Sequence, residues 1–259
     1  MDIPIYQVDA FASEVFTGNP AAVCPLDAWL SDDLMQAIAL ENNLSETAFI
    51  VKQGADFDLR WFTPAHEVDL CGHATLGSAY VIATYLEPGR DKVRFHSRGG
   101  LLTVTRAGDW YTLDFPSMPF KPVPIGDDLS EALGAAPVEV KAGKDLMAVF
   151  GTEAEVRALE PDMGRVAALD TRGVIATAPG EACDFVSRFF APRFGIPEDP
   201  VTGSAHCQLT PYWAARLGKT SMDARQISRR GGELKVEDRG ARVLISGRAA
   251  PYMEGRIRV

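Results

Sequence analysis

The feature that most constrains the fold of this chain is an internal repeat with a period of about 130 residues. Matching residue types recur in the same order in both halves, at a shift that drifts from 128 to 132 residues. The matched pairs include Phe57 and Phe185, Arg60 and Arg188, Phe62 and Phe190, Gly72 and Gly203, and Gly100 and Gly232. Duplication of this kind predicts two structurally similar domains.

Each half also contains a run without charged side chains. No Asp, Glu, Lys or Arg occurs in residues 72–86 or in residues 203–215. A helix that is apolar on all sides must be surrounded by protein, although Pro211 is expected to kink or divide the second one. We therefore predict an α+β fold of two pseudo-symmetric domains, each a curved, mostly antiparallel, barrel-like sheet around a central buried helix.

The boundary between the domains is indicated by four prolines between residues 116 and 124. Such a density of proline disfavours both helix and central strand and suits a connector. We predict an N-terminal lobe of residues 1–117, a C-terminal lobe of residues 118–250 and an active site in the cleft between them. Segment 251–259 is strand-like, and one arrangement left open is that it returns to the first lobe.

Composition excludes several classes of partner. The formal net charge of −9 repels phosphate backbones and anionic lipid, so we expect neither a nucleic-acid nor a membrane partner. The N-terminus lacks a signal-like pattern, and we expect a cytoplasmic protein. The four cysteines form no C-x-x-C pair, so we expect reduced thiols and no metal site.

Gly72-His73 and Gly203-Ser204 stand where the two buried helices are expected to begin. Backbone N–H groups at a helix start have no partner within the helix and attract anions. Glycine permits a close approach of the backbone, and His73 and Ser204 add side-chain donors. We predict that these four residues bind substrate; the structural alternative is that the glycines allow tight packing and Ser204 only caps its helix.

Two acids are further candidates. Glu46 lies among polar residues just before an apolar strand, where partial burial would raise its pKa toward the range of a general acid/base. Taken alone, it is better explained as a solvated loop glutamate or as an acid at a helix end. Asp199 precedes the second helix, where it could orient a substrate amine or hydroxyl or merely cap the helix. Asp69 is its counterpart in the first half, and His206 is expected to be a core residue.

Five segments, taken together, resemble a known family. They are Val8-Asp9-Ala10-Phe11 with Thr17-Gly18-Asn19-Pro20, Asn43-Leu44-Ser45-Glu46-Thr47, Arg60-Trp61-Phe62-Thr63-Pro64, Leu70-Cys71-Gly72-His73-Ala74-Thr75, and Glu198-Asp199-Pro200-Val201-Thr202-Gly203-Ser204-Ala205. They span nearly the whole chain, and the chain resembles the PhzF-like proteins of the diaminopimelate epimerase superfamily.

The resemblance implies a two-lobed, cofactor-free isomerase with a small carboxylate substrate, often a homodimer. In the phenazine-pathway member, which isomerises trans-2,3-dihydro-3-hydroxyanthranilate, the glutamate matching Glu46 moves a proton between carbons. The residues matching His73, Asp199 and Ser204 bind and orient the substrate. This assigns Glu46, His73 and Asp199 as catalytic, while fold-level likeness leaves the substrate open.

The epimerases and racemases of that superfamily use two opposed cysteines. Cys71 occupies the first position here, but Thr202 occupies the second, and a hydroxyl is too weak an acid to replace a thiol. The approach to residues 174–176 likewise offers Thr171-Arg172-Gly173 instead of an acid. We therefore predict single-base proton transfer by Glu46 with Cys71 as a spectator. An epimerase or racemase that uses Cys71 and a non-catalytic metabolite- or partner-binding protein remain the alternatives.

Overall fold

The computed structural model describes residues 1–259 and divides them into two compact units, residues 1–114 with 246–259 and residues 115–245. The bounds expected from the sequence were 1–117 and 118–250. The proline-rich segment lies within the second unit, where Pro122 is part of strand β9 (Lys121–Val123) at the edge of a ladder, a position that tolerates a missing N–H. No helix combines the length and the apolar character needed to cross a bilayer.

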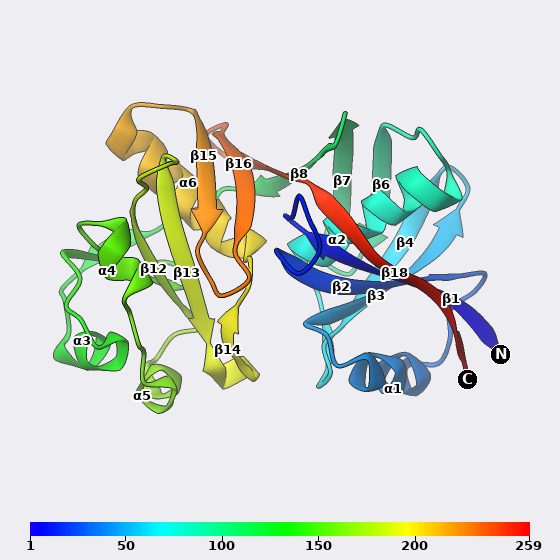
Figure 1. The fold of residues 1–259 in the computed structure, drawn as a ribbon, viewed down its shortest axis with the longest axis horizontal. Helices are drawn as coiled ribbons and strands as arrows, with labels where there is room; N and C mark the ends of the chain where they lie inside the picture. Colours follow the sequence, from blue (N-terminus) through cyan, green and yellow to red (C-terminus); the bar gives the residue numbers. More distant parts are fainter. The chain divides into compact units, whose positions relative to one another are not determined.

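The first unit contains nine strands of a mixed sheet, and most of them are labelled in Figure 1. They are β1 (Asp2–Ala10), β2 (Asn19–Leu26), β3 (Glu46–Gln53), β4 (Asp56–Phe62), β5 (Glu67–Val68), β6 (Lys92–Ser97), β7 (Gly100–Ala107), β8 (Trp110–Pro116) and β18 (Ala249–Arg258). Strand β18 pairs antiparallel with β1, so the C-terminal segment belongs to this unit. The β2–β3 and β4–β6 pairs are parallel and the other pairs are antiparallel.

The second unit repeats this order of pairing. Its strands are β9, β10 (Glu139–Ala142), β11 (Leu146–Val149), β12 (Val174–Pro179), β13 (Phe185–Ala191), β14 (Ile196–Asp199), β15 (Ser221–Gln226), β16 (Gly232–Asp238) and β17 (Arg242–Gly247). The parallel pairs are β11–β12 and β13–β15, which match β2–β3 and β4–β6. The repeat predicted from the sequence is therefore confirmed as a repeat of topology, and with it the predicted α+β fold.

A buried helix occupies each unit. Helix α2 (Gly72–Val81) is buried at every residue except Gly72 and Tyr80 and packs on β1, β2 and β3. Its hydroxyls bond back to its own carbonyls, Thr75 to Cys71 and Ser78 to Ala74, so they need no water. The uncharged run then ends in a π-helical turn, Ile82–Leu86.

Helix α6 (Gly203–Leu217) is the buried helix of the second unit. Pro211 lies inside it, and the helix continues past that residue as one element, so the expected division is wrong. Phe185 of β13 stacks on Trp213 after the proline and lies against His206 before it, which anchors the helix to the sheet on both sides of Pro211. Gly218 ends the helix in the left-handed conformation (φ 67°), where glycine carries no Cβ penalty.

Shorter helices cover the outer faces. Helix α1 (Asp32–Asn42) is capped by Ser31, ends at Asn43 and buries Met35, Ile38 and Ala39 in the first unit. The second unit uses three short helices, α3 (Asp127–Leu133), α4 (Glu153–Arg157) and α5 (Met163–Ala168), and a 3₁₀ turn (Pro192–Phe194). The apolar residues of the three helices pack in the hydrophobic core of this unit, which also contains Phe150 and Phe190.

Candidate functional site

The first candidate cluster lies at the start of α2 and contains Glu46, Cys71 and His73. Glu46 is the first residue of β3, Cys71 is the N-cap of α2 and His73 is the second residue of that helix. Parallel pairing of Glu46 with Ala21 fixes the start of β3 in the middle of the sheet. The sequence predicted both Glu46 and His73, and the structure brings them together.

The Glu46 and His73 side chains face each other in a nearly closed environment. His73 Nε2 lies 3.1 Å from Glu46 Oε2, and the side chains are only 7% and 12% exposed. The two atoms are nevertheless not aligned for a hydrogen bond, and neither has another partner. Buried polar atoms with unused hydrogen-bonding capacity are uncommon, and a catalytic role is one explanation for them. The contact is therefore an ion pair that retains capacity for a ligand.

Cys71 lies on the other side of the imidazole, with Sγ 3.5 Å from His73 Nδ1. Burial, reinforced by the negative charge of Glu46, raises the pKa of the Cys71 thiol to about 11, so the thiol is neutral at pH 7. Burial alone would lower the pKa of His73, but negative charge on Cys71 and Glu46 outweighs it and raises that pKa well above its ordinary value. The thiol is neutral at pH 7, so Glu46 is the neighbour that can balance a proton on His73 at that pH.

These three residues are also the group best placed to hold a metal ion, since their donor atoms lie within 4.8 Å of one another. The imidazole, however, turns Nδ1 toward Cys71 and Nε2 toward Glu46. Each ring nitrogen therefore faces a different neighbour, an arrangement that suits a proton relay as well as chelation through one nitrogen.

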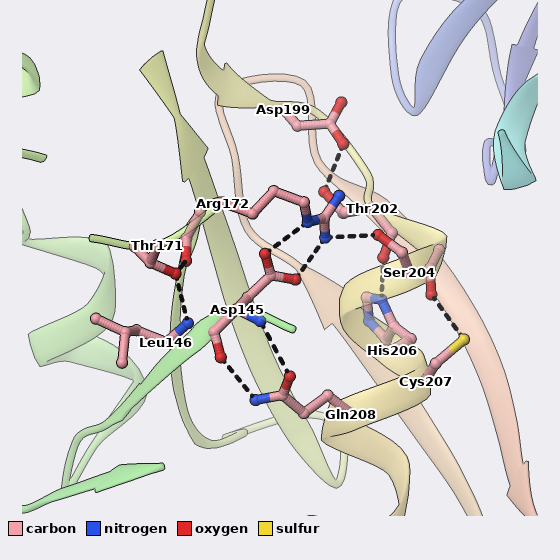
Figure 2. Close-up of polar contacts among 12 residues, drawn as sticks. Asp145, Leu146, Thr171, Arg172, Asp199, Thr202, Ser204, His206, Cys207 and Gln208 are labelled. Carbon is pink, nitrogen blue, oxygen red and sulfur yellow. Dashed lines mark hydrogen bonds and ion pairs between the residues drawn. The ribbon is translucent and has the colours of Figure 1, made fainter. Parts of the chain in front are cut away.

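The second candidate cluster lies at the start of α6 and includes the predicted residues Asp199, Gly203 and Ser204 (Figure 2). Thr202, the N-cap of α6, donates its hydroxyl to Asp199 Oδ2 at 2.5 Å and accepts from Gln226 Nε2 at 3.2 Å. Gln226 Nε2 also donates to the Asp199 carbonyl, at 2.7 Å. Asp199 is thus held by Thr202 at the start of α6 and by Gln226 of β15. Asp69, its expected counterpart in the first unit, is exposed.

Sequence reasoning missed the ion pair beside Ser204. Arg172 Nη2 donates to Ser204 Oγ at 3.0 Å, and Arg172 also forms a two-bond fork with Asp145 at 2.8 and 2.5 Å. In the sequence Arg172 stands only where an acid is absent. The relation becomes visible once the strands are known, because Asp145 directly precedes β11 and Arg172 lies two residues before β12, much as Glu46 opens β3.

His206 is fully buried within α6, as expected for a core residue. Its Nδ1 lies 2.8 Å from the carbonyl of Thr202, and its Nε2 has no partner. Burial lowers the pKa of His206 to about 4, so Nδ1 carries the single proton of a neutral ring and donates it to that carbonyl. The histidine supports the start of α6 without facing an acid.

Comparison with known proteins identifies relatives that share both the sequence and the fold of this chain. The family model for phenazine biosynthesis-like proteins matches residues 8–255. An uncharacterized isomerase of Pseudomonas aeruginosa is 53% identical over 257 residues, which cover 99% of both chains. The crystal structure of a PhzF-family phenazine biosynthesis protein from Enterococcus faecalis covers all of both chains, with 48% identity and a TM-score of 0.98.

A more distant structure shows how widely the fold is shared. A probable proline racemase from Agrobacterium radiobacter matches 99% of this chain and 93% of its own, with a TM-score of 0.69 at 12% identity, a likeness of fold alone. The diaminopimelate epimerase-like fold is thus common to the family and to racemases. On the family model and on the identity to its relatives, this chain belongs to the phenazine biosynthesis-like (PhzC–PhzF) family.

Proposed function

We propose that this protein is a cofactor-independent isomerase that moves a proton between carbon atoms of a small carboxylate-bearing metabolite. Glu46 acts as the single general acid/base. The observation that carries the proposal is the buried Glu46–His73 pair, whose facing atoms lie 3.1 Å apart and have no hydrogen-bond partner. Members of the family that are named as isomerases support the reaction class.

The proposed step needs no external reactant. The Glu46 carboxylate takes a proton from a C–H bond of the substrate, and the electron pair of that bond enters a conjugated, negatively charged intermediate. The same carboxyl group then returns the proton to a different carbon, so that one C–H bond is broken and one is formed. A carboxylate that accepts the proton becomes a carboxylic acid that can return it, so one group serves both halves of the exchange.

Two features of the first unit support this chemistry. The His73 imidazolium lies beside Glu46, where it offsets the carboxylate charge and can donate to negative charge that develops on the substrate. The N-terminus of α2 adds backbone amides, with Gly72 as its first residue. Asp199, Gly203 and Ser204 of the second unit stay proposed substrate-binding residues, as they were on the sequence.

Epimerisation through Cys71 is the second candidate, because Cys71 Sγ lies 3.5 Å from His73 Nδ1. Its thiol, however, has a pKa of about 11, and the equivalent N-cap of α6 is Thr202. A neutral thiol without an opposed thiol cannot take a proton from one face of a carbon and return one to the other. Single-base isomerisation therefore accounts for more of the site than epimerisation does.

The proposal is tested by NMR in deuterated water with a panel of small amino and hydroxy carboxylates. The wild-type protein is expected to incorporate deuterium or to shift a double bond in at least one compound, and Glu46→Gln is expected to abolish the reaction. Glu41→Gln, which removes an exposed glutamate of α1, serves as the matched control. Binding without exchange across the panel would contradict the proposal and favour a metabolite-binding role. The homodimer expected from the resemblance is tested separately by sedimentation.

A further inference from the structure

The ion pair of Asp145 and Arg172 in the second unit has no role in the chemistry described above. Figure 2 shows Arg172 reaching from the start of β12 to Asp145 on one side and to Ser204 on the other. The Asp145 side chain is only 1% exposed, whereas that of Arg172 is 31% exposed. One end of this chain of contacts is therefore buried, and the other reaches the partly exposed Ser204.

The buried end is held rigidly. The backbone N–H of Asp145 donates to Gln208 Oε1 at 3.4 Å, and Gln208 Nε2 donates to the Asp145 carbonyl at 3.1 Å. The carboxylate itself accepts both bonds of the Arg172 fork. A two-bond fork fixes the plane of a guanidinium as well as its position, and the Arg172 group also lies 5.3 Å over the Phe189 ring.

This rigidity sets the direction of the Ser204 hydroxyl. Ser204 Oγ accepts a hydrogen bond from the Arg172 cation, and a guanidinium can only donate. The hydroxyl proton must therefore point toward a different acceptor, and donation from a cation polarises the O–H group and strengthens it as a donor. Because Asp145 balances the charge of Arg172, the Ser204 hydroxyl is directed without a large net positive charge beside it.

The equivalent place in the first unit supports a role for Arg172. Ser204 and His73 are each the second residue of a buried helix. Each contacts a charged side chain near the start of one of two equivalent strands, β12 for Ser204 and β3 for His73. In the first unit that group is the Glu46 acid, and in the second it is the Arg172 cation. The repeat thus keeps the contact and reverses its charge.

We propose that Arg172, anchored by Asp145, is a positioning residue that directs the Ser204 hydroxyl to a carboxylate group of the ligand. The inference rests on the proposed function, because it names the group that holds the carboxylate of that substrate. The new element is Arg172, which is inferred to favour a carboxylate over an uncharged amide of the same shape. Arg172 acts through Ser204 and not by its own contact with the ligand.

The test compares binding of benzoate and of its uncharged isostere benzamide by calorimetry and thermal shift. The wild-type protein is expected to prefer benzoate by about tenfold. Arg172→Gln and Ser204→Ala are each expected to remove that preference, and the double variant is expected to resemble either single variant, since the two residues form one unit. Arg165→Gln, which removes an exposed arginine that is ion-paired to Glu131, serves as the control.

Three results would overturn the inference. The first is a wild-type protein that does not respond to benzoate at about 10 mM, where even a millimolar ligand occupies most of its site. The second is a preference that survives Arg172→Gln, and the third is a double variant whose losses multiply. If Arg172→Gln unfolds the protein, Arg172→Lys keeps Asp145 paired but breaks the fork, and it must still lose the preference. None of these readings depends on proton transfer, so the inference and the proposed function fail separately.

Discussion

At the start of α2 an acid lies against the second residue of the helix, whereas at the start of α6 a guanidinium does. The backbone plan is shared: each helix begins with glycine, each N-cap lacks a side-chain cap bond, and each lies on the same order of strands. The charged side chain at each helix start differs in sign. The acid Glu46 contacts His73 in the first unit, and the cation Arg172 contacts Ser204 in the second. The two units therefore share their backbone arrangement, whereas the buried pair of an acid and a histidine occurs at the start of α2 and not at the start of α6.

The two buried histidines show the same division. His73 faces Glu46, and its pKa is raised despite burial. His206 faces only the carbonyl of Thr202, and burial lowers its pKa to about 4. A buried histidine beside an acid becomes a cation that can donate protons, whereas one without an acid becomes a neutral part of the core.

Within the comparison of the two histidines, the largest expected effect is on catalysis, from His73→Gln. Gln cannot carry the positive charge that pairs with Glu46, so we expect kcat to fall by about 10²- to 10⁴-fold. Because the pKa of His73 is raised, wild-type activity should decline only as pH rises above neutral and His73 loses its proton. The variant should lack that alkaline limb. Measurement of kcat against pH checks both, and an unchanged limb in His73→Gln would contradict the assignment.

The next effect is on stability, from His206. In the unfolded chain His206 takes up a proton near pH 6.5. In the folded protein it does so only near pH 4, because it is buried. The free energy of unfolding should therefore fall as pH falls through this window, by roughly 3 kcal/mol for this group. In His206→Gln that part of the acid sensitivity should disappear, although the variant starts from lower stability.

Urea unfolding at several pH values measures this slope, with the exposed His66→Gln as the control. The comparison of the two histidines would fail if His206→Gln kept the full acid sensitivity of the wild-type protein.

The smallest effect concerns Thr202, the N-cap residue of α6. Thr202 bridges Asp199 and Gln226, so Thr202→Val should lower the free energy of unfolding by about 1–2 kcal/mol through the loss of these bonds. It should also loosen Asp199 and weaken carboxylate binding. Thr202→Ser keeps the hydroxyl and should restore both. If Thr202→Val behaves like Thr202→Ser, the bridge does not hold Asp199.

Much of this organisation could be predicted from the sequence. The absence of charge in residues 72–86 and 203–215 required two enclosed helices, and the matched Arg60 and Arg188 marked equivalent strands. The continuity of α6 through Pro211 could not be predicted, because Trp213 and Phe185 pack across elements that are distant in the sequence. Tertiary packing of this kind overrides a local breaker.

The candidate site was predictable where a motif holds it and not elsewhere. Glu46 and His73 belong to recognisable segments, and the structure places them 3.1 Å apart. Asp145 is separated from Ser204 by 59 residues and meets it only through Arg172. Only the return of β11 beside β12 brings these groups together, and the pattern of the sequence does not reveal that pairing.

The central claim is that one base, Glu46, moves the proton, and it is tested most directly by comparing Glu46→Gln with Cys71→Ser. Both variants are incubated in deuterated water with a carboxylate that the wild-type protein turns over, and carbon-bound deuterium is followed by NMR. We expect Glu46→Gln to lower the exchange rate by at least about 10³-fold and Cys71→Ser to keep it within about tenfold. Full exchange in Glu46→Gln, or stereochemical inversion that disappears in Cys71→Ser, would contradict the single-base account.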